Sequence, residues 1–184
     1  MVNNGTLRQE YTSITGSWVL DLSRSDTFEA FLHCLGTPQS AIQAQVAGER
    51  AHQSRNVIKL DESTLVVHKN TAVHHFTDSF ELGQERFTPR RTISGNVGRG
   101  GNMATAFLAH GGELDGYVVA TTTTGPSGSP NQETVEVRQL VDRGLAHTQE
   151  ISVQNLETGE RCIITRLWIR VPMTQDDRLQ LLAG

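Results

Sequence analysis

The chain has 184 residues, a hydrophobic content of 36% and a formal net charge of −4 at pH 7, which is ordinary for one globular domain with a single core. Neither sign of charge dominates enough to predict a nucleic-acid partner. No apolar run reaches the roughly 18 residues of a membrane-spanning helix and no secretion signal is readable, so we expect no transmembrane segment and a cytoplasmic location. Cys34 and Cys162 are too few for a disulfide framework, so both are expected to be free thiols.

The beginning of the chain predicts a leader and then a strand. Residues 1–12 are polar and are expected to form a flexible leader. Over residues 14–22 apolar and polar side chains alternate, as they do in a half-buried strand. We therefore expect the folded domain to begin near residue 13 and to extend to residue 172.

Two short helices are predicted after this strand. Ser25 or Asp26 can cap a helix over residues 28–35, where apolar side chains recur at three- and four-residue spacing before a glycine. A second helix is expected over residues 40–47.

From residue 56 onward the pattern is that of strands separated by turn-rich stretches. The expected strands are 57–60, 64–70, 74–82, 87–94, 102–110, 114–123, 133–141, 145–156 and 160–171. With the first strand there are ten, and closing ten antiparallel strands into a barrel removes their exposed edges and leaves a ligand cavity, with Trp18 in the floor. The tail, residues 173–184, predicts either a short amphipathic helix carrying Leu179, Leu181 and Leu182 or a frayed end, which we favour.

Two strands each carry one arginine among apolar neighbours. In a strand of period two, Ile164, Arg166 and Trp168 share a face, so an arginine and an aromatic ring lie side by side. A buried and unpaired guanidinium costs several kcal/mol, so Arg166 and Arg138 are expected to recruit a carboxylate or phosphate. Glu136 lies two residues from Arg138 on the same face and could supply this countercharge from within the chain.

Five short motifs occur in order along the chain. They read Gly16-Ser17-Trp18, Phe28-Glu29-Ala30-Phe31-Leu32, Phe80-Glu81-Leu82-Gly83-Gln84-Glu85, Val137-Arg138-Gln139-Leu140-Val141-Asp142-Arg143 and Thr165-Arg166-Leu167-Trp168. The chain thereby resembles the intracellular fatty-acid-binding proteins of the calycin superfamily, whose last strand carries Thr-Arg-x-Tyr. The resemblance covers roughly residues 13–172.

The resemblance implies an all-β fold, a ten-stranded antiparallel up-and-down β-barrel (calycin) with a two-helix lid between the first and second strands. It also implies a function, the intracellular binding or transport of a fatty acid or another small hydrophobic anion, without catalysis and without a cofactor. Arg138 and Arg166 would hold the carboxylate headgroup with Trp168 beside them. Phe28 and Phe31, at aromatic lid positions of the family, would close over the tail.

Two positions depart from the family pattern. Trp168 replaces the tyrosine whose hydroxyl hydrogen-bonds the carboxylate, and its larger indole can still donate through its N–H. Arg86 stands where the family has phenylalanine, which leaves the register of that strand open by one residue.

A second interpretation belongs to a different class of function. The barrel could be a non-enzymatic interaction module that binds little or no ligand and docks a protein partner through the leader, the 124–132 loop and the tail. Leu167 and Ile169 favour it, because they lie on the outward face of the last strand, where a free carrier is more often polar.

No motif for catalysis or for a metal site is recognised. We find no nucleophile with a neighbouring base and no paired acidic motif, so no catalytic residue is assigned. His68, His74 and His75 cluster in sequence, but the last two point to opposite faces of a strand, so we expect surface histidines and no metal.

Overall fold

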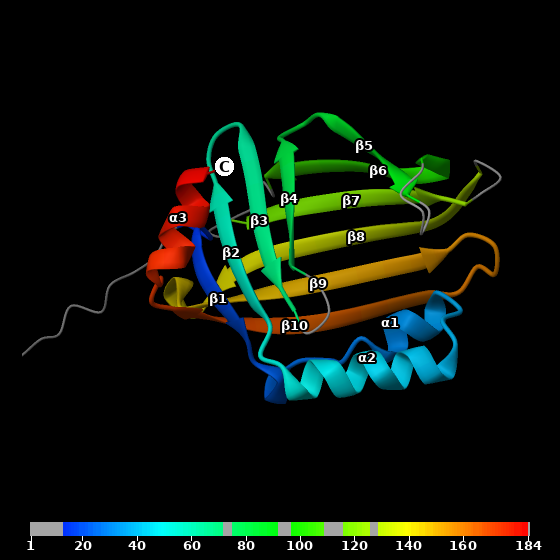
Figure 1. Ribbon diagram of the computed structural model, residues 1–184, viewed down its shortest axis with the longest axis horizontal. Coiled ribbons are helices and arrows are strands. Elements are labelled where there is room, and N and C mark those ends of the chain that lie inside the picture. Colours follow the sequence, from blue (N-terminus) through cyan, green and yellow to red (C-terminus); the bar gives the residue numbers. More distant parts are fainter. Residues whose placement is uncertain (1–12, 72–74, 92–96, 109–115, 126–128, 184) are drawn as a thin grey trace, which may run out of the picture.

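The computed structural model describes residues 13–71, 75–91, 97–108, 116–125 and 129–183. Its strands form one antiparallel ten-stranded sheet in the order β4-β3-β2-β1-β10-β9-β8-β7-β6-β5, curled into a barrel (Figure 1). The strands are β1 (Gly16–Leu20), β2 (Arg55–Leu60), β3 (Thr64–Asn70), β4 (His75–Glu81), β5 (Glu85–Arg91), β6 (Val97–Leu108), β7 (Gly116–Thr124), β8 (Pro130–Val141), β9 (Ala146–Asn155) and β10 (Arg161–Val171). The predicted ten-stranded up-and-down barrel is confirmed.

The barrel wraps because the first and last strands are neighbours. β1 pairs with β10 from Ser17↔Val171 to Leu20↔Trp168, and with β2 on its other side. Trp18 is fully buried, as expected for a floor residue, and its Nε1 donates to the carbonyl of Ile14 at 2.9 Å. The inward side chains of the strands form one core, made of Ile14, Trp18, Leu20, Ile58, Leu65, Val67, Phe80, Ala104, Ala106, Tyr117, Leu140 and Trp168.

The barrel is not closed between β4 and β5, which are the two ends of the sheet order. The described contacts across this gap include an isolated bridge between Leu82 and Ala106, with the Gly83 amide donating to the Ala106 carbonyl at 2.7 Å. Arg86 adds a bond from its Nη1 to the Ser79 carbonyl at 2.6 Å. The expectation that closure removes every strand edge is therefore wrong, because β4 and β5 diverge and form no ladder with each other in the described part of the chain.

Strand β6 begins earlier than predicted. β6 begins at Val97, inside a glycine-rich stretch expected to be a turn. Gly101 pairs with Pro89 of β5, and a Cβ at Gly101 would lie 2.8 Å from the Phe87 ring and 2.6 Å from the Thr88 carbonyl. The glycine here serves the close packing of two strands rather than a turn.

Two helices between β1 and β2 form the predicted lid, α1 (Glu29–Cys34) and α2 (Gln39–Ala51), which lie together beside β10 (Figure 1). The predicted cap of α1 is wrong. Ser25 Oγ instead accepts the Leu167 amide and Asp26 Oδ2 accepts the Thr165 amide, each at 2.8 Å, so both side chains anchor the chain to β10. Helix α2 extends beyond residues 40–47 at both ends, starting directly after Pro38.

The base of the barrel is sealed by Arg170, the next inward residue after Trp168. Its guanidinium donates to the carbonyls of Gly144 at 2.7 Å, Thr15 at 2.9 Å and Ser13 at 2.6 Å. Its Cζ lies 4.2 Å from the ring centroid of Trp18. Chain segments from both ends of the sequence are thereby joined below the core.

The tail forms helix α3 (Gln175–Ala183) and not the frayed end that we favoured. Asp177 is the reason. It forms a reciprocal capping pair with Thr174, whose amide donates to Oδ2 at 2.6 Å while Thr174 Oγ1 accepts the Asp177 amide at 3.1 Å. Asp177 also pairs with Arg55 of β2, and this contact holds α3 against the barrel.

None of the described helices is both long enough and apolar enough to cross a membrane.

Candidate functional site

A row of polar side chains crosses the inside of the barrel. Tyr117, Arg138, Gln149 and Arg166 are successive cross-strand partners on β7, β8, β9 and β10. All four residues are at most 5% exposed. The period-two prediction that both arginines point inward is thus met, and the sheet register places them two strands apart, on either side of Gln149.

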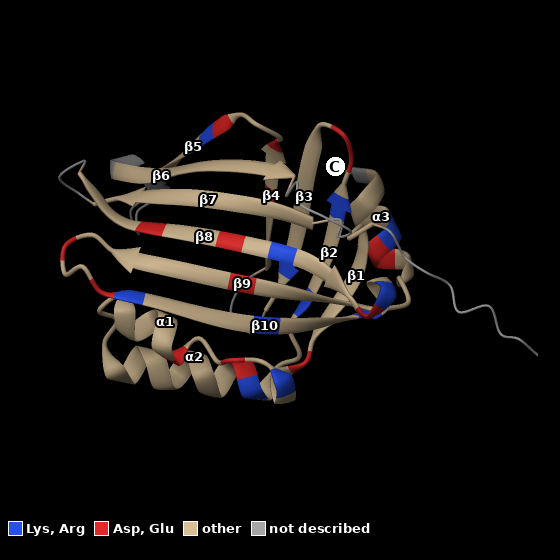
Figure 2. Cartoon of the chain, turned by 180° about the vertical axis from the view of Figure 1, so that it is seen from behind, with Lys and Arg blue, Asp and Glu red and all other residues tan. Residues whose placement is uncertain are grey.

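Arg138 is paired within its own strand. Its Nε donates to Glu136 Oε1 at 2.6 Å, so the countercharge considered from the sequence is present. Burial alone would raise the pKa of Glu136, but the charges of Arg138 and Lys69 and its hydrogen bonds to Arg138 and Gln149 lower it to about 2. The pair is therefore ionised. Figure 2 shows an acidic position next to a basic one on β8.

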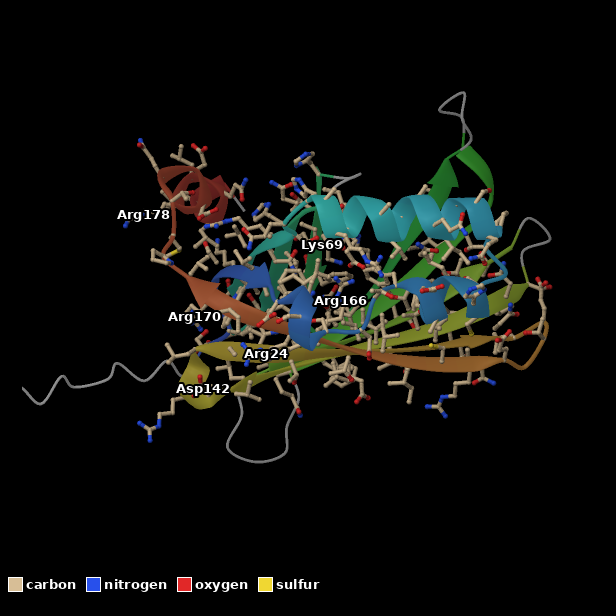
Figure 3. The ribbon with its side chains drawn as sticks, turned by 90° about the horizontal axis from the view of Figure 1, so that it is seen from below. Arg24, Lys69, Asp142, Arg166, Arg170 and Arg178 are labelled. Carbon is tan, nitrogen blue, oxygen red and sulfur yellow. The ribbon has the colours of Figure 1, made fainter. Side chains whose placement is uncertain are left out.

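Arg166 is paired with the lid. Its Nη2 donates to Oε1 of Glu49, which is buried on the inner face of α2 with Ile42 and Val46. The Phe28 ring, just before α1, covers the guanidinium at 4.2 Å from Cζ to the centroid. Arg166 is drawn close to the lid helices in Figure 3. Both arginines therefore have carboxylate partners, one in the barrel wall and one on the lid.

The Arg166–Glu49 pair is incompletely bonded. Arg166 Nε and Glu49 Oε2 are buried and have no hydrogen-bond partner among the described residues. Burial lowers the pKa of Arg166, and Glu49 offsets only part of this effect. Because a guanidinium edge suits two parallel bonds to one carboxylate, the single bond to Glu49 leaves unused binding capacity.

Trp168 is the next inward residue after Arg166 on β10 and is 4% exposed. Its Nε1 donates to Gln149 Oε1 at 2.8 Å, so the indole N–H is engaged within the row, and a contact of Trp168 with a headgroup stays a prediction. The His147 ring stacks on Trp168 with centroids 6.0 Å apart. Burial and the neighbouring charge of Arg138 hold the pKa of His147 well below its usual value, so this ring is neutral.

The predicted lid aromatics lie together. Phe28 and Phe31 make an edge-to-face pair with centroids 5.6 Å apart, and both are half-buried. Only the contact of Phe28 with Arg166 connects this pair directly to the polar row among the described ring contacts.

An internal cavity of about 210 Å³ adjoins the row on the side of the β4–β5 gap. Four charged side chains line this cavity, namely the Lys69–Asp78 ion pair at 3.1 Å, Glu136 and Arg86. The Tyr117 hydroxyl is buried there without a partner among the described groups. Apolar lining comes from Val67, Phe80, Ala104 and Val119.

Glu49, Tyr117 and Gln149 belong to the site, but the sequence analysis did not select them. Gln149 and Tyr117 follow from the strand register, which period-two alternation does not supply. Glu49 lies on a helix, 117 positions before Arg166, and nothing in the chain signals that α2 docks this way round.

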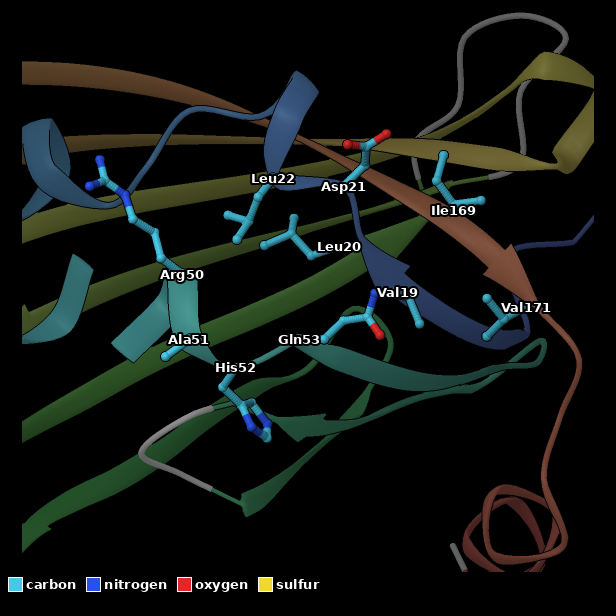
Figure 4. Close-up of a pocket in the computed structure, with 10 residues that line it drawn as sticks. All are labelled: Val19, Leu20, Asp21, Leu22, Arg50, Ala51, His52, Gln53, Ile169 and Val171. Carbon is cyan, nitrogen blue, oxygen red and sulfur yellow. The ribbon is translucent and has the colours of Figure 1, made fainter. Parts of the chain in front are cut away.

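A second hollow of about 640 Å³ lies outside the barrel, between the end of α2 and strands β1 and β10 (Figure 4). Ile169 lines it together with Val19, Leu20, Asp21, Leu22, Arg50, Ala51, His52, Gln53 and Val171. Leu167 is half-buried, and its backbone carbonyl accepts the Asp21 amide while its own amide donates to Ser25 Oγ.

The residues discounted from the sequence add no further site. In the described residues no group of three or more His, Cys, Asp or Glu side chains could hold a metal ion. His68 Nδ1 lies 2.8 Å from Thr77 Oγ1, and His74 is outside the described residues. Cys34 and Cys162 are free thiols.

Comparison with known proteins supports the architecture. No family model matches the chain, and no curated protein matches it by sequence. Among solved structures, the REP1-NXSQ fatty acid transporter superposes with a TM-score of 0.60 at 17% identity, over 88% of this chain and 98% of its own. The fatty-acid-binding protein from brain tissue of Drosophila melanogaster superposes with a TM-score of 0.55 at 16% identity, over 85% and 99%.

The fold is that of a fatty-acid-binding protein. At such identities the likeness establishes the fold alone, and it covers 88% and 85% of this chain, in which two helices lie between β1 and β2 as expected. The predicted architecture and the structural resemblance are therefore confirmed.

Proposed function

We propose that this protein is an intracellular carrier, which binds a fatty acid or a similar hydrophobic anion inside the barrel without catalysing a reaction. The observation that carries this proposal is Arg166, 2% exposed beneath the lid, whose Nε has no partner among the described residues. A carboxylate headgroup that accepts from both Nε and Nη2 would complete its hydrogen bonds. Arg138 adds a second positive charge in the same row.

The tail would supply most of the affinity. Each buried methylene contributes about 0.8 kcal/mol, so about ten methylenes suffice for micromolar binding. Phe28 and Phe31 of the lid, with Val67, Phe80 and Val119 of the wall, provide apolar surface on the two sides of the row.

The cavity beside the polar row, about 210 Å³, lies below the roughly 300–1,000 Å³ that is usual for ligand pockets, so this cavity alone does not hold a long-chain ligand. We therefore propose that the lid moves when a long-chain ligand enters.

Titration of a fluorescent fatty-acid analogue tests the proposal. Wild type is expected to bind it with micromolar or tighter affinity, and Arg166→Gln to lose about tenfold or more, because a charge-assisted bidentate contact is removed. The matched control is Arg178→Gln, an exposed arginine on α3, which should bind like wild type. Equal binding by wild type and Arg166→Gln, or none by wild type, would refute the carrier proposal.

A second candidate function is the interaction module, a barrel that binds a protein partner and little or no ligand. It is favoured by the carboxylate partners that both arginines already have, Glu136 and Glu49. Native mass spectrometry of the protein from its own cells separates the two candidates. A bound small molecule supports the carrier, whereas a ligand-free barrel that co-purifies with another protein supports the module.

A further inference from the structure

The charges of the two arginines in the polar row are already balanced. Arg138 and Arg166 are matched by Glu136 and Glu49, and each ion pair is formed between nearly buried groups. A fatty-acid carboxylate that simply joined them would place an extra negative charge in a space shielded from water. Like charges that share such a site raise each other's energy steeply, so one carboxylate has to leave or become protonated.

The two carboxylates differ in their freedom to leave. Glu136 is on β8, whose backbone is hydrogen-bonded into the ladder between β7 and β9, so only a change of its side-chain rotamer could separate it from Arg138. Glu49 is on α2 and reaches Arg166 through one guanidinium nitrogen. Its second oxygen, Oε2, has no partner among the described groups.

Hydrogen bonds to the barrel hold the lid on both sides of α2, whereas α2 itself is held by the packing of Ile42 and Val46 and by the Glu49–Arg166 pair. Before α1, Ser25 and Asp26 hold the chain to β10, and at the end of α1 the Asn155 side chain donates to the Cys34 carbonyl at 3.1 Å. After α2, the Leu20 amide donates to the Ser54 carbonyl at 3.0 Å. Helix α2 is thus the part of the lid that can swing while its flanks stay in place.

We propose that Glu49 occupies the carboxylate position of the ligand in the empty protein, and that an incoming fatty-acid headgroup displaces it from Arg166 together with α2. This inference rests on the proposed carrier function and names the residue that determines its selectivity. The exchange of one carboxylate for another leaves the interior charge unchanged. It also replaces a contact through one nitrogen by one that uses both Nε and Nη2 of Arg166.

The consequence is a specific dependence on ligand charge. A ligand with the same chain but a neutral headgroup does not bind Arg166 in place of Glu49, so the Glu49 carboxylate competes with anionic ligands and not with neutral ones. Removing the Glu49 charge should therefore favour the acid far more than the alcohol.

Hexadecanoic acid and hexadecanol, each displacing a fluorescent analogue, test the proposal on wild type and Glu49→Gln. The variant is expected to bind the acid about tenfold more tightly than wild type and the alcohol within about twofold of wild type. Glu29→Gln, at an exposed position of α1, is the matched control and should change neither affinity.

Two results would overturn the role of Glu49. An unchanged or weaker affinity of Glu49→Gln for the acid would show that Glu49 does not compete, and an equal gain for acid and alcohol would show only a loosened lid. Both are distinct from failure of the carrier function itself, in which wild type binds no acid or Arg166→Gln binds it as well as wild type does.

Hydrogen exchange on wild type provides a measurement that does not depend on how the variant folds. Adding hexadecanoic acid should make the amides around Ile42 to Glu49 exchange severalfold faster, because α2 is released, while the amides of β8 and β9 exchange more slowly. Slower exchange throughout α2 on binding would contradict the displacement of Glu49.

Discussion

The two arginines of the polar row, Arg138 and Arg166, are neighbours in space but differ in how they are held. Arg138 is paired with Glu136 of its own strand, while Arg166 is paired with Glu49 of the lid. Burial lowers the pKa of both guanidinium groups, but Glu136 and Tyr117 more than reverse this effect for Arg138, whose pKa is raised. The pKa of Arg166 stays lowered in spite of Glu49.

This difference separates a structural ion pair from one that can be exchanged. A countercharge built into a β-ladder is present whether or not a ligand is bound, so Arg138 contributes mainly to the stability and the electrostatic field of the wall. A countercharge on a helix outside the sheet can be withdrawn. Arg166 is therefore the arginine whose carboxylate partner a ligand can replace.

The largest expected effect comes from deleting the fixed countercharge. Glu136→Gln should lower the free energy of unfolding by about 3–5 kcal/mol, because Arg138 is left buried without an ionic partner. Glu49→Gln should cost less than half as much, because α2 can move and admit water to Arg166. Urea denaturation measures both, with Glu133→Gln on the exposed face of β8 as the control. Equal losses for the two variants would contradict the distinction between the arginines.

Acid should weaken the protein through the same fixed pair. The pKa of Glu136 is about 2 in the folded protein and near 4.5 when unfolded, so its contribution is complete above pH 4.5 and is lost as the pH falls towards 2. The loss attributable to Glu136 is about 3 kcal/mol. Denaturation of wild type and Glu136→Gln between pH 6 and pH 2 should give converging stabilities. Parallel curves would show that this carboxyl has no lowered pKa.

A smaller effect is expected on the lid side of the comparison. Phe28→Leu removes the ring over Arg166 and should lower the unfolding free energy by about 1 kcal/mol more than Phe31→Leu does. Both variants lose the same aromatic pair, so their difference isolates the cation–π contact. Indistinguishable urea midpoints would rule out a significant role for this contact.

The smallest effect is expected at a third arginine, across the β4–β5 gap. Arg86 is half-buried, donates to the Ser79 carbonyl and lies 5.3 Å from the centroid of the Phe80 ring. Arg86→Lys keeps the charge but loses the directed bond, and should cost less than about 1 kcal/mol. Hydrogen exchange should reveal faster opening at Phe80 with little change at β8. A loss as large as that of Glu136→Gln would mean that the gap is a rigid part of the wall.

The fold was predictable because its main signals are local. Alternation marks the strands, and an apolar helical pattern marks the first helix after β1, whereas the lid formed by the two helices was implied by the resemblance. The exceptions are places where distant backbone decides the outcome. Val97 to Gly101 is strand because β5 packs against it, Ser25 and Asp26 serve β10 and not α1, and the tail is helical because Asp177 meets Arg55.

The site was predictable along each strand but not across elements. The spacing of Arg166 and Trp168, and of Glu136 and Arg138, follows from a period of two residues, and the ion pair of Glu136 with Arg138 is present. Gln149, which accepts the indole N–H of Trp168, lies on the neighbouring strand and did not follow from the spacing along β10. The contact with Glu49 depends on how a helix docks on a sheet, which no local pattern encodes.

Because β1 pairs with β10, the barrel can be completed only after the last strand has been synthesised. Ser17 faces Val171 in this ladder, and the lid is anchored to the same final strand through Asp26 and Thr165. A nascent chain on the ribosome has made both lid helices long before β10 emerges, so their apolar faces remain without a docking surface until translation is nearly over. Such long-range closure is slow, and during this interval chaperones would meet the lid helices as exposed apolar segments.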